Sequence, residues 1–535
     1  MAALSPAARA TALAALPTAD LDLLVVGGGI TGAGIARDAA LRGLSVALLE
    51  AVDFAAGTSS RSSKLVHGGV RYLQQGDIGL VREAASERAR IRHIAPHLAT
   101  PLLMVMPTYG RATHLKLGAG LWTFEKIASV DASERHSMWD RSEALAQEPC
   151  LAADRLHGAA AFVEYLTDDA RLVLATVAGA AAAGALCANH AEVMAIDRGT
   201  VTVRDVFEGT VLEARARVVV NAAGPWVEEI WRRAGAAPGR GLQLTKGIHL
   251  VVDHGRLPLR HSVVMQARDH RSVFAVPRDG ITYLGTTDTL FDTPTLHPGI
   301  TGDDVDYLLD AARRTFGGEP LARSDVLASW AGLRPLVREE GKAPSEISRK
   351  DEIATDAATG LISIAGGKLT TYRRMAERVV DLVFDRLGRS APPCRTDQVA
   401  LQGGEPTSLD PAALASRLPQ LRTDQAARLF RLHGATCERL FERIGESPAS
   451  GEIVSGLPGV LRAEVEYALD EEMALTLEDL LDRRTRSLSF DRRQGVEGVE
   501  AAAAIASQRL GWSTERTAAE IDGYRKLAAS LRSFS

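Results

Sequence analysis

Short apolar runs alternate with glycine-rich turns and helical patterns in the first fifty residues of the chain. Residues 21–26, L-D-L-L-V-V, form an apolar run of strand length, and G-G-G-I-T-G follows directly. The residues after this turn predict a helix that ends at Gly43. The side chains on its inner face are small or apolar: Ile35, Ala36, Ala39 and Ala40. Residues 44–49, L-S-V-A-L-L, predict a second strand that ends at Glu50.

Apolar runs that break into turns of small residues recur twice later in the chain. Residues 216–227, A-R-V-V-V-N-A-A-G-P-W-V, predict a strand followed by such a turn. Residues 360–383 predict a strand, a glycine turn and an amphipathic helix. The longest uncharged run, residues 172–188, follows two aspartates and is too short and too rich in Ala and Gly to cross a bilayer, so it predicts a buried helix.

The last third of the chain has a different pattern. From about Pro392 the sequence becomes helical and charged, and the turns described above no longer occur. This change predicts a separate helical domain over residues 392–535. The basic run R-R-T-R at 483–486 is interpreted as a solvated face of that domain.

Composition excludes several classes of protein. The 535 residues are 46% hydrophobic and 24% charged, with a net charge of −5, which does not suggest a nucleic-acid binder. The four cysteines are scattered and no metal-ligand cluster occurs, which fits a reducing cytoplasm. The first twenty residues carry two prolines and lack a basic start before an apolar core, so no signal peptide is expected.

The first glycine turn carries a dinucleotide fingerprint. Gly27, Gly29 and Gly32 follow the spacing G-x-G-x-x-G between a strand and a helix, and Glu50 stands 23 residues after the first glycine. Gly27 permits the tight turn, Gly29 admits the pyrophosphate, Gly32 allows close helix packing, and the acid accepts hydrogen bonds from the ribose. The two further strand–turn segments favour FAD over NAD, because large FAD enzymes hold one flavin with several distant segments.

The segment A-G-G-K-L-T-T-Y-R at 365–373 resembles a phosphate loop but departs from it at two positions. A P-loop needs G-x-x-x-x-G-K-[ST], whereas Ile362 occupies the place of the first glycine and Leu369 that of the hydroxyl residue. We interpret this turn as one that presents its backbone and Lys368 to a flavin ring and a bound substrate.

Seven segments in the same order resemble the FAD-dependent glycerol-3-phosphate dehydrogenase family, the aerobic, respiratory enzymes. They are V-V-G-G-G-I-T-G-A-G-I-A-R-D-A-A-L-R-G-L-S-V, G-T-S-S-R-S-S-K-L-V-H-G-G-V-R-Y-L, V-N-A-A-G-P-W, T-K-G-I-H-L-V-V, L-G-T-T-D-T, A-G-L-R-P-L and G-G-K-L-T-T-Y-R. The resemblance covers roughly residues 20 to 535 and implies an α/β fold: a Rossmann-like FAD-binding domain with an inserted sheet-rich substrate domain and an all-helical C-terminal domain. We therefore expect an N-terminal extension (1–20), an oxidoreductase unit (21–391) with FAD-binding segments near 21–90, 170–235 and 330–391, and the helical domain (392–535).

The resemblance also implies which residues hold FAD, without a covalent bond. His67 is expected to pack near the flavin. The implied cofactor-binding residues are Gly27, Gly29, Ile30, Thr31, Gly32, Glu50, Thr58, Ser59, Ser60, Ser63, Lys64, His67, Gly68, Gly69, Ala223, Gly224, Trp226, Gly366, Gly367, Lys368, Leu369 and Thr370.

Arginines in apolar contexts point to a phosphorylated substrate. Arg71 and Arg334 could grip a phosphate with paired hydrogen bonds, although an internal salt bridge is the alternative for each. His249 alternates with apolar residues on a predicted strand; it is either a packed histidine or the proton acceptor. The resemblance favours the catalytic interpretation for His249, Arg334 and Lys368. It places around the substrate Arg71, Tyr72, Asp288, Arg334, Arg349 and Lys368, with Asp288 either orienting the histidine or capping a turn.

The expected reaction is the oxidation of sn-glycerol 3-phosphate to dihydroxyacetone phosphate in glycerol and glycerophospholipid catabolism. Hydride passes to flavin N5 and the electrons pass to a membrane quinone. We expect a cytoplasmic enzyme bound peripherally to the inner membrane, with a homodimer as one arrangement that the resemblance allows. The alternatives are an oxygen-dependent glycerol-3-phosphate or amine oxidase, and a flavin-binding regulatory protein without turnover.

Overall fold

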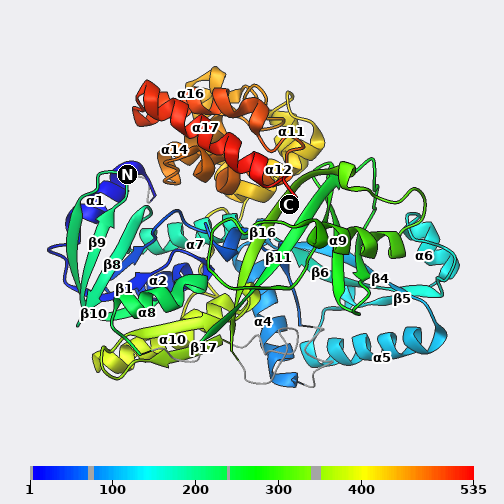
Figure 1. Cartoon of the computed structure of the whole chain (residues 1–535), viewed down its shortest axis with the longest axis horizontal. Coiled ribbons are helices and arrows are strands. Elements are labelled where there is room, and N and C mark those ends of the chain that lie inside the picture. Colours follow the sequence, from blue (N-terminus) through cyan, green and yellow to red (C-terminus); the bar gives the residue numbers. More distant parts are fainter. Residues whose placement is uncertain (1–3, 70–76, 238–240, 339–350, 535) are drawn as a thin grey trace.

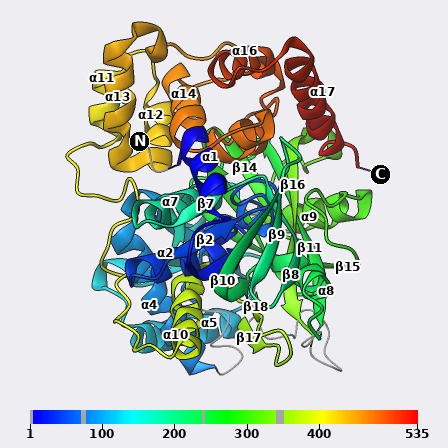
Figure 2. The same cartoon turned by 90° about the vertical axis from the view of Figure 1, so that its left-hand side faces the viewer.

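The computed structural model describes residues 4–69, 77–237, 241–338 and 351–534. Figure 1 shows an α/β part built around β1 and β10, a second sheet that contains β4 and β11, and a group of helices, α11 to α17, that lies across one side of both. Figure 2 shows the same helical group on one side of the two sheets.

The first sheet is mainly parallel. Its strand order is β17–β18–β10–β1–β2–β7, and the neighbours from β18 to β7 pair in parallel, while β17 is antiparallel at the edge. β8 and β9 extend β10 as an antiparallel meander. The strands are β1 (Leu21–Val26), β2 (Val46–Leu49), β7 (Leu186–Ala188), β8 (Ala191–Asp197), β9 (Thr200–Asp205), β10 (Val211–Asn221), β17 (Asp351–Thr355) and β18 (Ile362–Gly366).

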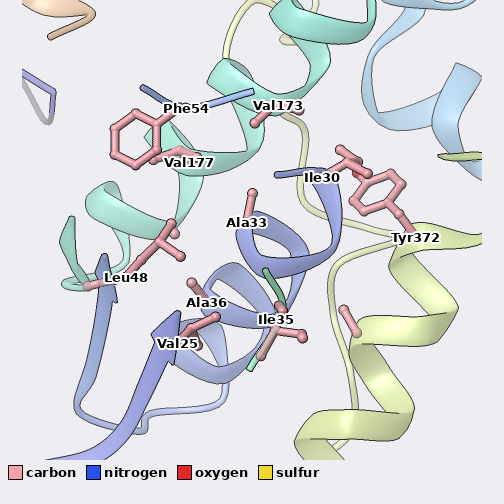
Figure 3. Packing of buried hydrophobic residues seen from close by; sticks show 14 of the residues in the cluster. Val25, Ile30, Ala33, Ile35, Ala36, Leu48, Phe54, Val173, Val177 and Tyr372 are labelled. Atoms are coloured by element: carbon pink, nitrogen blue, oxygen red, sulfur yellow. The ribbon is translucent and has the colours of Figure 1, made fainter. Parts of the chain in front are cut away.

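Alternate side chains of β1 are buried on opposite faces of this sheet. Leu23 and Val25 belong to a core with three helices, α2 (Ile30–Leu41), α7 (Asp169–Ala182) and α10 (Tyr372–Leu387). Figure 3 shows Val25 in this core. Leu24 and Val26 join a second core with α8 (Val227–Arg233) and α1 (Pro6–Ala15). Strands of a parallel sheet that is covered on both faces are mostly apolar, and β1 is apolar at every position except Asp22. The buried helix predicted from the long uncharged run is confirmed by α7.

The second sheet is mainly antiparallel and holds the two longest strands of the described residues. β11 and β16 pair over their length, so that residues of both strands face each other across the centre of the molecule. The strands are β3 (Leu65–Val66), β4 (Thr100–Thr108), β5 (Ser137–Asp140), β6 (Gly158–Leu166), β11 (Leu242–Asp253), β12 (Ser262–Gln266), β13 (Ser272–Arg278), β14 (Ile281–Gly285), β15 (Thr289–Phe291) and β16 (Val326–Val337).

Four helices cover this second sheet: α4 (Ile78–Ile94), α5 (Arg111–Ala128), α6 (Arg141–Gln147) and α9 (Gly302–Thr315). The start of α9 shows why the chain turns helical there. The Thr301 side chain accepts the backbone N–H of Asp304, and the Asp304 carboxylate accepts that of Thr301, a reciprocal cap that satisfies two N–H groups at the helix start.

The helical part packs around two apolar cores of its own. One core gathers leucines and alanines of α14, α16 and α17, and the other those of α11, α12 and α13. The helices are α11 (Pro411–Arg417), α12 (Thr423–His433), α13 (Cys437–Glu446), α14 (Arg462–Glu471), α15 (Ser487–Phe490), α16 (Val499–Leu510) and α17 (Thr514–Ser530), with a π-helical turn over Asp479–Arg484.

The first residues of the chain dock onto the α/β part. In α1, the Arg9 guanidinium binds the Asp205 carboxylate at 2.8 Å and the backbone carbonyls of Asn189 and His190, while Leu13 and Leu16 enter the core. In the part of the chain that the structure describes, no helix is long and apolar enough to cross a bilayer.

Candidate active site

The turn between β1 and α2 has room for glycine alone at two positions. Gly27 has φ +108°, and a Cβ there would lie 2.6 Å from the carbonyl oxygen of Ala222. A Cβ on Gly32 would lie 1.9 Å from the carbonyl oxygen of Gly27, so this glycine lets α2 pack directly on the turn. Gly29 lies in the wall of a cavity, next to the first N–H groups of α2. The turn therefore presents bare backbone and a helix N-terminus to that cavity.

Glu50 lies where the fingerprint predicts it, at the end of β2. Its carboxylate accepts the N–H of Gly28 at 2.7 Å and that of Val52 at 2.9 Å, which fixes the side chain in the cavity wall. Burial raises the pKa of Glu50, while the two backbone N–H groups oppose that shift. A fixed carboxylate beside the glycine turn is the arrangement that holds a ribose hydroxyl.

A cavity of about 650 Å³ lies between the two sheets and brings together most of the predicted site residues. This volume lies within the usual range of small-molecule and cofactor sites. The predicted residues in its wall are Gly29, Ile30, Thr31, Glu50, Thr58, Ser59, Ser63, His67, Gly69, Ala223, Gly224, His249, Asp288, Arg334, Gly366, Gly367, Lys368, Leu369 and Thr370. Arg71, Tyr72 and Arg349 lie outside the described residues.

The remaining predicted cofactor residues lie behind the wall. Gly27 and Gly32 shape the turn. Gly68 donates its backbone N–H to the Glu164 carboxylate at 2.7 Å. The Trp226 ring packs on Gly57, where an added Cβ would lie 3.1 Å from the ring. Ser60 and Lys64 are fully buried on the far side of their loop, away from the cavity. These residues support the lining segments from behind.

His249 stands on β11 inside the cavity wall and is 1% exposed. Its Nε2 lies 2.9 Å from the Ser63 hydroxyl, and its ring stacks on Trp330 with centroids 4.7 Å apart. Gly285, opposite on β14, leaves room for the ring, because a Cβ there would lie 2.0 Å from the imidazole Cδ2. Burial, with the charges of Lys64 and Arg334, holds the pKa of His249 well below its usual value. The imidazole is therefore neutral near pH 7 and can accept a proton.

Arg334 reaches the cavity from β16, two strand residues beyond Gly332. Its guanidinium binds the Asp288 carboxylate at 3.1 Å, the carbonyl of Thr287 at 3.1 Å and the hydroxyl of Thr286 at 2.9 Å. Gly247 on β11 lies beneath it; a Cβ there would lie 2.4 Å from Nη2 of the guanidinium. The arginine is thus held in one orientation across the strand.

Asp288 lies between two arginines. It binds Arg334, and Arg271 lies on its other side, with Nη1 donating to the Asp288 carbonyl at 3.0 Å. These contacts place Asp288 beside Arg334 and leave its two predicted roles, orienting His249 or capping a turn, as predictions. Arg271 itself was missed by sequence reasoning, because its loop between β12 and β13 carries no motif.

The G-G-K turn lies at the end of β18, on the same cavity. Gly366 and Gly367 have φ +75° and +81°, and a Cβ on Gly367 would lie 2.4 Å from the Met375 sulfur, so both positions need glycine. Lys368 follows in extended backbone and begins a 3₁₀ turn, Leu369–Thr371, that leads into α10. Lys368, Leu369 and Thr370 all line the cavity. The turn thus presents its backbone, its lysine and a helical N-terminus to a ligand there.

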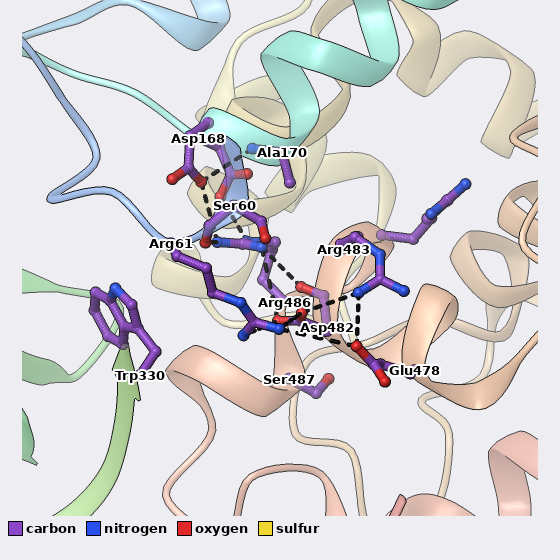
Figure 4. Close-up of polar contacts among 12 residues, drawn as sticks. Ser60, Arg61, Asp168, Ala170, Trp330, Glu478, Asp482, Arg483, Arg486 and Ser487 are labelled. Carbon is purple, nitrogen blue, oxygen red and sulfur yellow. Dashed lines mark hydrogen bonds and ion pairs between the residues drawn. The ribbon is translucent and has the colours of Figure 1, made fainter. Parts of the chain in front are cut away.

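The loop that carries Ser59 and Ser63 is fixed by a buried group of charges (Figure 4). The Asp169 carboxylate accepts both the N–H and the hydroxyl of Ser62, and it binds the Lys64 ammonium at 2.9 Å. Burial lowers the pKa of Lys64 to about 8, although Asp169 opposes the shift. Arg486 of the helical part binds Asp169 and Asp168, each at 3.2 Å.

The basic run at 483–486 is therefore not a solvated face, and that interpretation was wrong. Arg483, Arg484 and Arg486 are each at most 2% exposed. Arg483 and Arg484 both bind Asp53, which follows the first βαβ unit, and Arg61 of the loop binds Asp482 at 2.9 Å. Some of the acids that neutralise the run are local, such as Asp479 and Asp482, but Asp53, Asp168 and Asp169 lie more than 300 residues earlier, so the burial of the run is not visible in the local pattern.

One end of the cavity is apolar, and no sequence motif marks it. Its wall consists there of Met104, Met106, Phe162, Val264 and Phe274, from four strands of the second sheet. His67 lies beside this end, with its ring 5.3 Å from that of Phe274 and its Nδ1 3.9 Å from Glu164. Such residues are ordinary strand formers, so only the sheet register shows that they share a cavity.

Comparisons with known proteins identify this architecture. The profile of the FAD dependent oxidoreductase family matches residues 22–399, and that of the C-terminal domain of alpha-glycerophosphate oxidase matches residues 394–517. An aerobic glycerol-3-phosphate dehydrogenase of Bacillus subtilis is 41% identical over 95% of this chain and 94% of its own. The chain belongs to the FAD-dependent glycerol-3-phosphate dehydrogenase family. The predicted family and fold class are thus confirmed.

Further members of this family agree. An aerobic glycerol-3-phosphate dehydrogenase of Staphylococcus aureus is 39% identical over 94% of this chain and 93% of its own. The crystal structure of the glycerol-3-phosphate dehydrogenase from Bacillus halodurans, complexed with FAD, superposes with a TM-score of 0.81 at 34% identity and covers 99% of this chain and 98% of its own.

The cavity of this chain fits the family cofactor FAD. The turn at Gly27–Gly29 and the first N–H groups of α2 suit the pyrophosphate, and the fixed Glu50 carboxylate suits a ribose. The G-G-K turn and His249 line the same cavity, where the flavin ring and a substrate would meet.

Proposed function

We propose that this chain oxidises sn-glycerol 3-phosphate to dihydroxyacetone phosphate. The observation that carries the proposal is a neutral, buried histidine, His249, in one cavity with a fixed arginine, Arg334, and the glycine–lysine turn at Lys368. Oxidation of a secondary alcohol removes a proton from the hydroxyl and a hydride from the carbon. When bound, FAD would supply the hydride acceptor for this oxidation.

His249 takes the hydroxyl proton in this proposal. A neutral imidazole has one nitrogen that accepts, and its Nε2 partner, the Ser63 hydroxyl, also lines the cavity. The substrate proton passes to the ring either directly or through Ser63. Stacking on Trp330 holds the His249 ring in place for this transfer, and Gly285 leaves room for the ring because it has no side chain.

The phosphate is held by arginine. Arg334 is oriented by Asp288 and Thr286, so that its guanidinium needs no rearrangement to bind an anion. Arg71, Tyr72 and Arg349 are proposed to complete this subsite on the strength of the family resemblance. Lys368 stabilises the negative charge that develops on the alcohol oxygen and on the cofactor.

We propose a membrane quinone as the electron acceptor, since aerobic glycerol-3-phosphate dehydrogenases at about 40% identity cover nearly the whole chain. The enzyme would then bind peripherally to the cytoplasmic face of the membrane. The second candidate is an oxidase, because the profile that matches residues 394–517 is that of an alpha-glycerophosphate oxidase domain.

Anaerobic mixing of the purified flavoprotein with glycerol 3-phosphate tests the proposal. The yellow flavin absorbance should bleach with the phosphorylated substrate and stay unchanged with glycerol. Added ubiquinone should then restore the colour faster than air does, whereas rapid peroxide formation would favour the oxidase. Absence of bleaching by glycerol 3-phosphate would rule the proposed reaction out.

A further inference from the structure

The outer face of α5 carries an apolar stripe in contact with solvent. Leu115 and Trp122, seven residues apart, are 63% and 58% exposed. Two exposed alanines continue the same face: Ala119 lies between them, and Ala112 lies one turn before Leu115. Residues seven apart on an α-helix lie almost directly above one another. These are the two most exposed large apolar side chains of any described helix. Exposed Trp and Leu in one stripe mark a binding surface.

Basic side chains surround this stripe. Arg111, Lys116 and Lys126 are all exposed, and the Lys126 ammonium lies 5.7 Å from the centre of the Trp122 ring. The single acid of the helix, Glu125, is turned sideways and binds the His136 ring at 2.7 Å. The chain as a whole has a net charge of −5, so this positive face is a local feature.

The neighbouring segments extend the same edge of the molecule. Tyr109, just before α5, is 46% exposed, and Ile78, at the start of α4, is 47% exposed. The end of α5 packs on the start of α4 through Phe124 and Val81. Figures 1 and 2 place α5 along the edge of the molecule opposite the C-terminal helices, so a flat surface could meet it without touching them.

The inner face of α5 covers the apolar end of the cavity. Leu117 and Leu121 pack against Met104, Met106 and Phe162, and these three residues line the cavity on their other side. One helix therefore separates the solvent-facing stripe from the place where an apolar electron acceptor would approach the cofactor.

We propose that the outer face of α5 is the surface with which this enzyme lies on an anionic lipid bilayer. The inference rests on the proposed function, which needs a membrane quinone. Trp122 and Leu115 enter the headgroup region, and Arg111, Lys116 and Lys126 bind anionic lipid headgroups. A second copy of this chain is a poorer occupant, because pairing two such faces would bring their cations together.

Flotation of the holoenzyme with lipid vesicles tests this surface. The wild-type protein should float with phosphatidylglycerol vesicles, far less with phosphatidylcholine vesicles, and less as salt is raised to 1 M. The double variant Leu115→Ser/Trp122→Ser should partition into phosphatidylglycerol vesicles at least about tenfold more weakly. The charge variant Lys116→Glu/Lys126→Glu, which leaves all apolar packing intact, should lose the preference for anionic lipid.

A matched control is the double variant Val211→Ser/Leu290→Ser, which removes side chains that are 60% and 57% exposed outside α5. It should float like wild type. All variants should reduce a soluble dye with glycerol 3-phosphate at the wild-type rate, whereas the α5 variants should lose reduction of vesicle-borne quinone. Unchanged flotation of both α5 variants would overturn the proposal. It would also be overturned if the wild-type protein were a dimer in solution and these variants were monomers, because α5 would then be a contact between two copies of the chain. A failure to bleach with glycerol 3-phosphate would count against the reaction and not against this surface.

Discussion

At the scale of single residues, the site depends on side chains whose surroundings fix both their charge and their direction. Arg334, the proposed phosphate ligand, is an example: it is held by Asp288 and Thr286 and lies over Gly247. An arginine that is fixed before the ligand arrives loses little conformational freedom on binding.

Replacing Arg334 by Met should therefore affect the phosphorylated substrate selectively. We expect kcat/KM for glycerol 3-phosphate to fall by a factor that corresponds to at least about 3 kcal/mol of lost transition-state stabilisation, and kcat/KM for glycerol to change little. Arg268→Met is the control, because that side chain is 75% exposed in a surface pair with Asp310. Equal losses with both substrates would show that Arg334 does not hold the phosphate.

The depressed pKa of His249 predicts the pH dependence of turnover. Burial is the main cause, reinforced by the charges of Lys64 and Arg334. Because the neutral base is the active form, kcat should stay flat as the pH falls to 6.5 and decline only below it. Stability should also fall below pH 6.5, since the unfolded chain takes up a proton there that the folded histidine does not. A kcat profile with an acid limb at pH 6.5 or above would contradict a neutral buried base.

At the scale of elements, the serine loop before β3 depends on helical segments far away in the chain. Arg486, just after the π-helical turn, binds Asp168 and Asp169 at the start of α7, and Asp169 holds Ser62. Ser63, the next residue, contacts His249. The helical part is thus connected to His249, the proposed proton acceptor, through the ion pairs of Arg486, the hydrogen bond between Asp169 and Ser62, and the hydrogen bond between Ser63 and His249.

Arg486→Met should lower kcat through this connection while FAD stays bound. We expect a loss of about tenfold, since small displacements of a reacting group are costly, and partial recovery in Arg486→Lys, which keeps a charge. The matched control is Arg492→Met, whose side chain is 58% exposed in a pair with Asp253. If Arg486→Met loses flavin yet the remaining holoenzyme turns over normally, Arg486 stabilises the fold and does not position the loop.

At the scale of the whole molecule, the helical part and the α/β part are joined by buried charges. Asp53 binds Arg483 at 2.6 Å and also binds Arg484, and Arg171 of α7 binds Glu472 at 2.6 Å beside them. Buried ion pairs of this kind add little to the free energy of unfolding compared with well-packed apolar residues. The loss of one partner, however, leaves a buried charge without a counter-charge.

Asp53→Asn should therefore destabilise the whole protein, by about 3–5 kcal/mol on the scale of broken buried pairs. The midpoint of thermal unfolding, followed by far-ultraviolet circular dichroism and by flavin release, should fall, and both signals should change together. Asp306→Asn is the control, because Asp306 pairs with Arg323 at the surface and its loss should leave the midpoint unchanged. A normal midpoint for Asp53→Asn would mean that the buried pairs do not join the two parts.

The turns and buried elements of this protein can be predicted from its amino-acid sequence. The spacing of the glycines at 27, 29 and 32, of the acid at 50 and of the G-G-K turn is visible in the chain, because these residues belong to one strand–turn–helix–strand unit and to one strand–turn–helix unit. The apolar periods of β1 and α7 likewise predicted buried elements that the structure contains. These features follow from interactions between near neighbours.

Only the tertiary structure decided how distant segments meet. It placed Ser63 beside His249, 186 residues away, and paired the basic run at 483–486 with acids from the first third of the chain. It also gathered an apolar cavity wall from four strands and turned Leu115 and Trp122 outward on α5. The physical reason is the same in each case: charge pairing, burial and sheet register depend on partners across the fold, and a local pattern does not contain them.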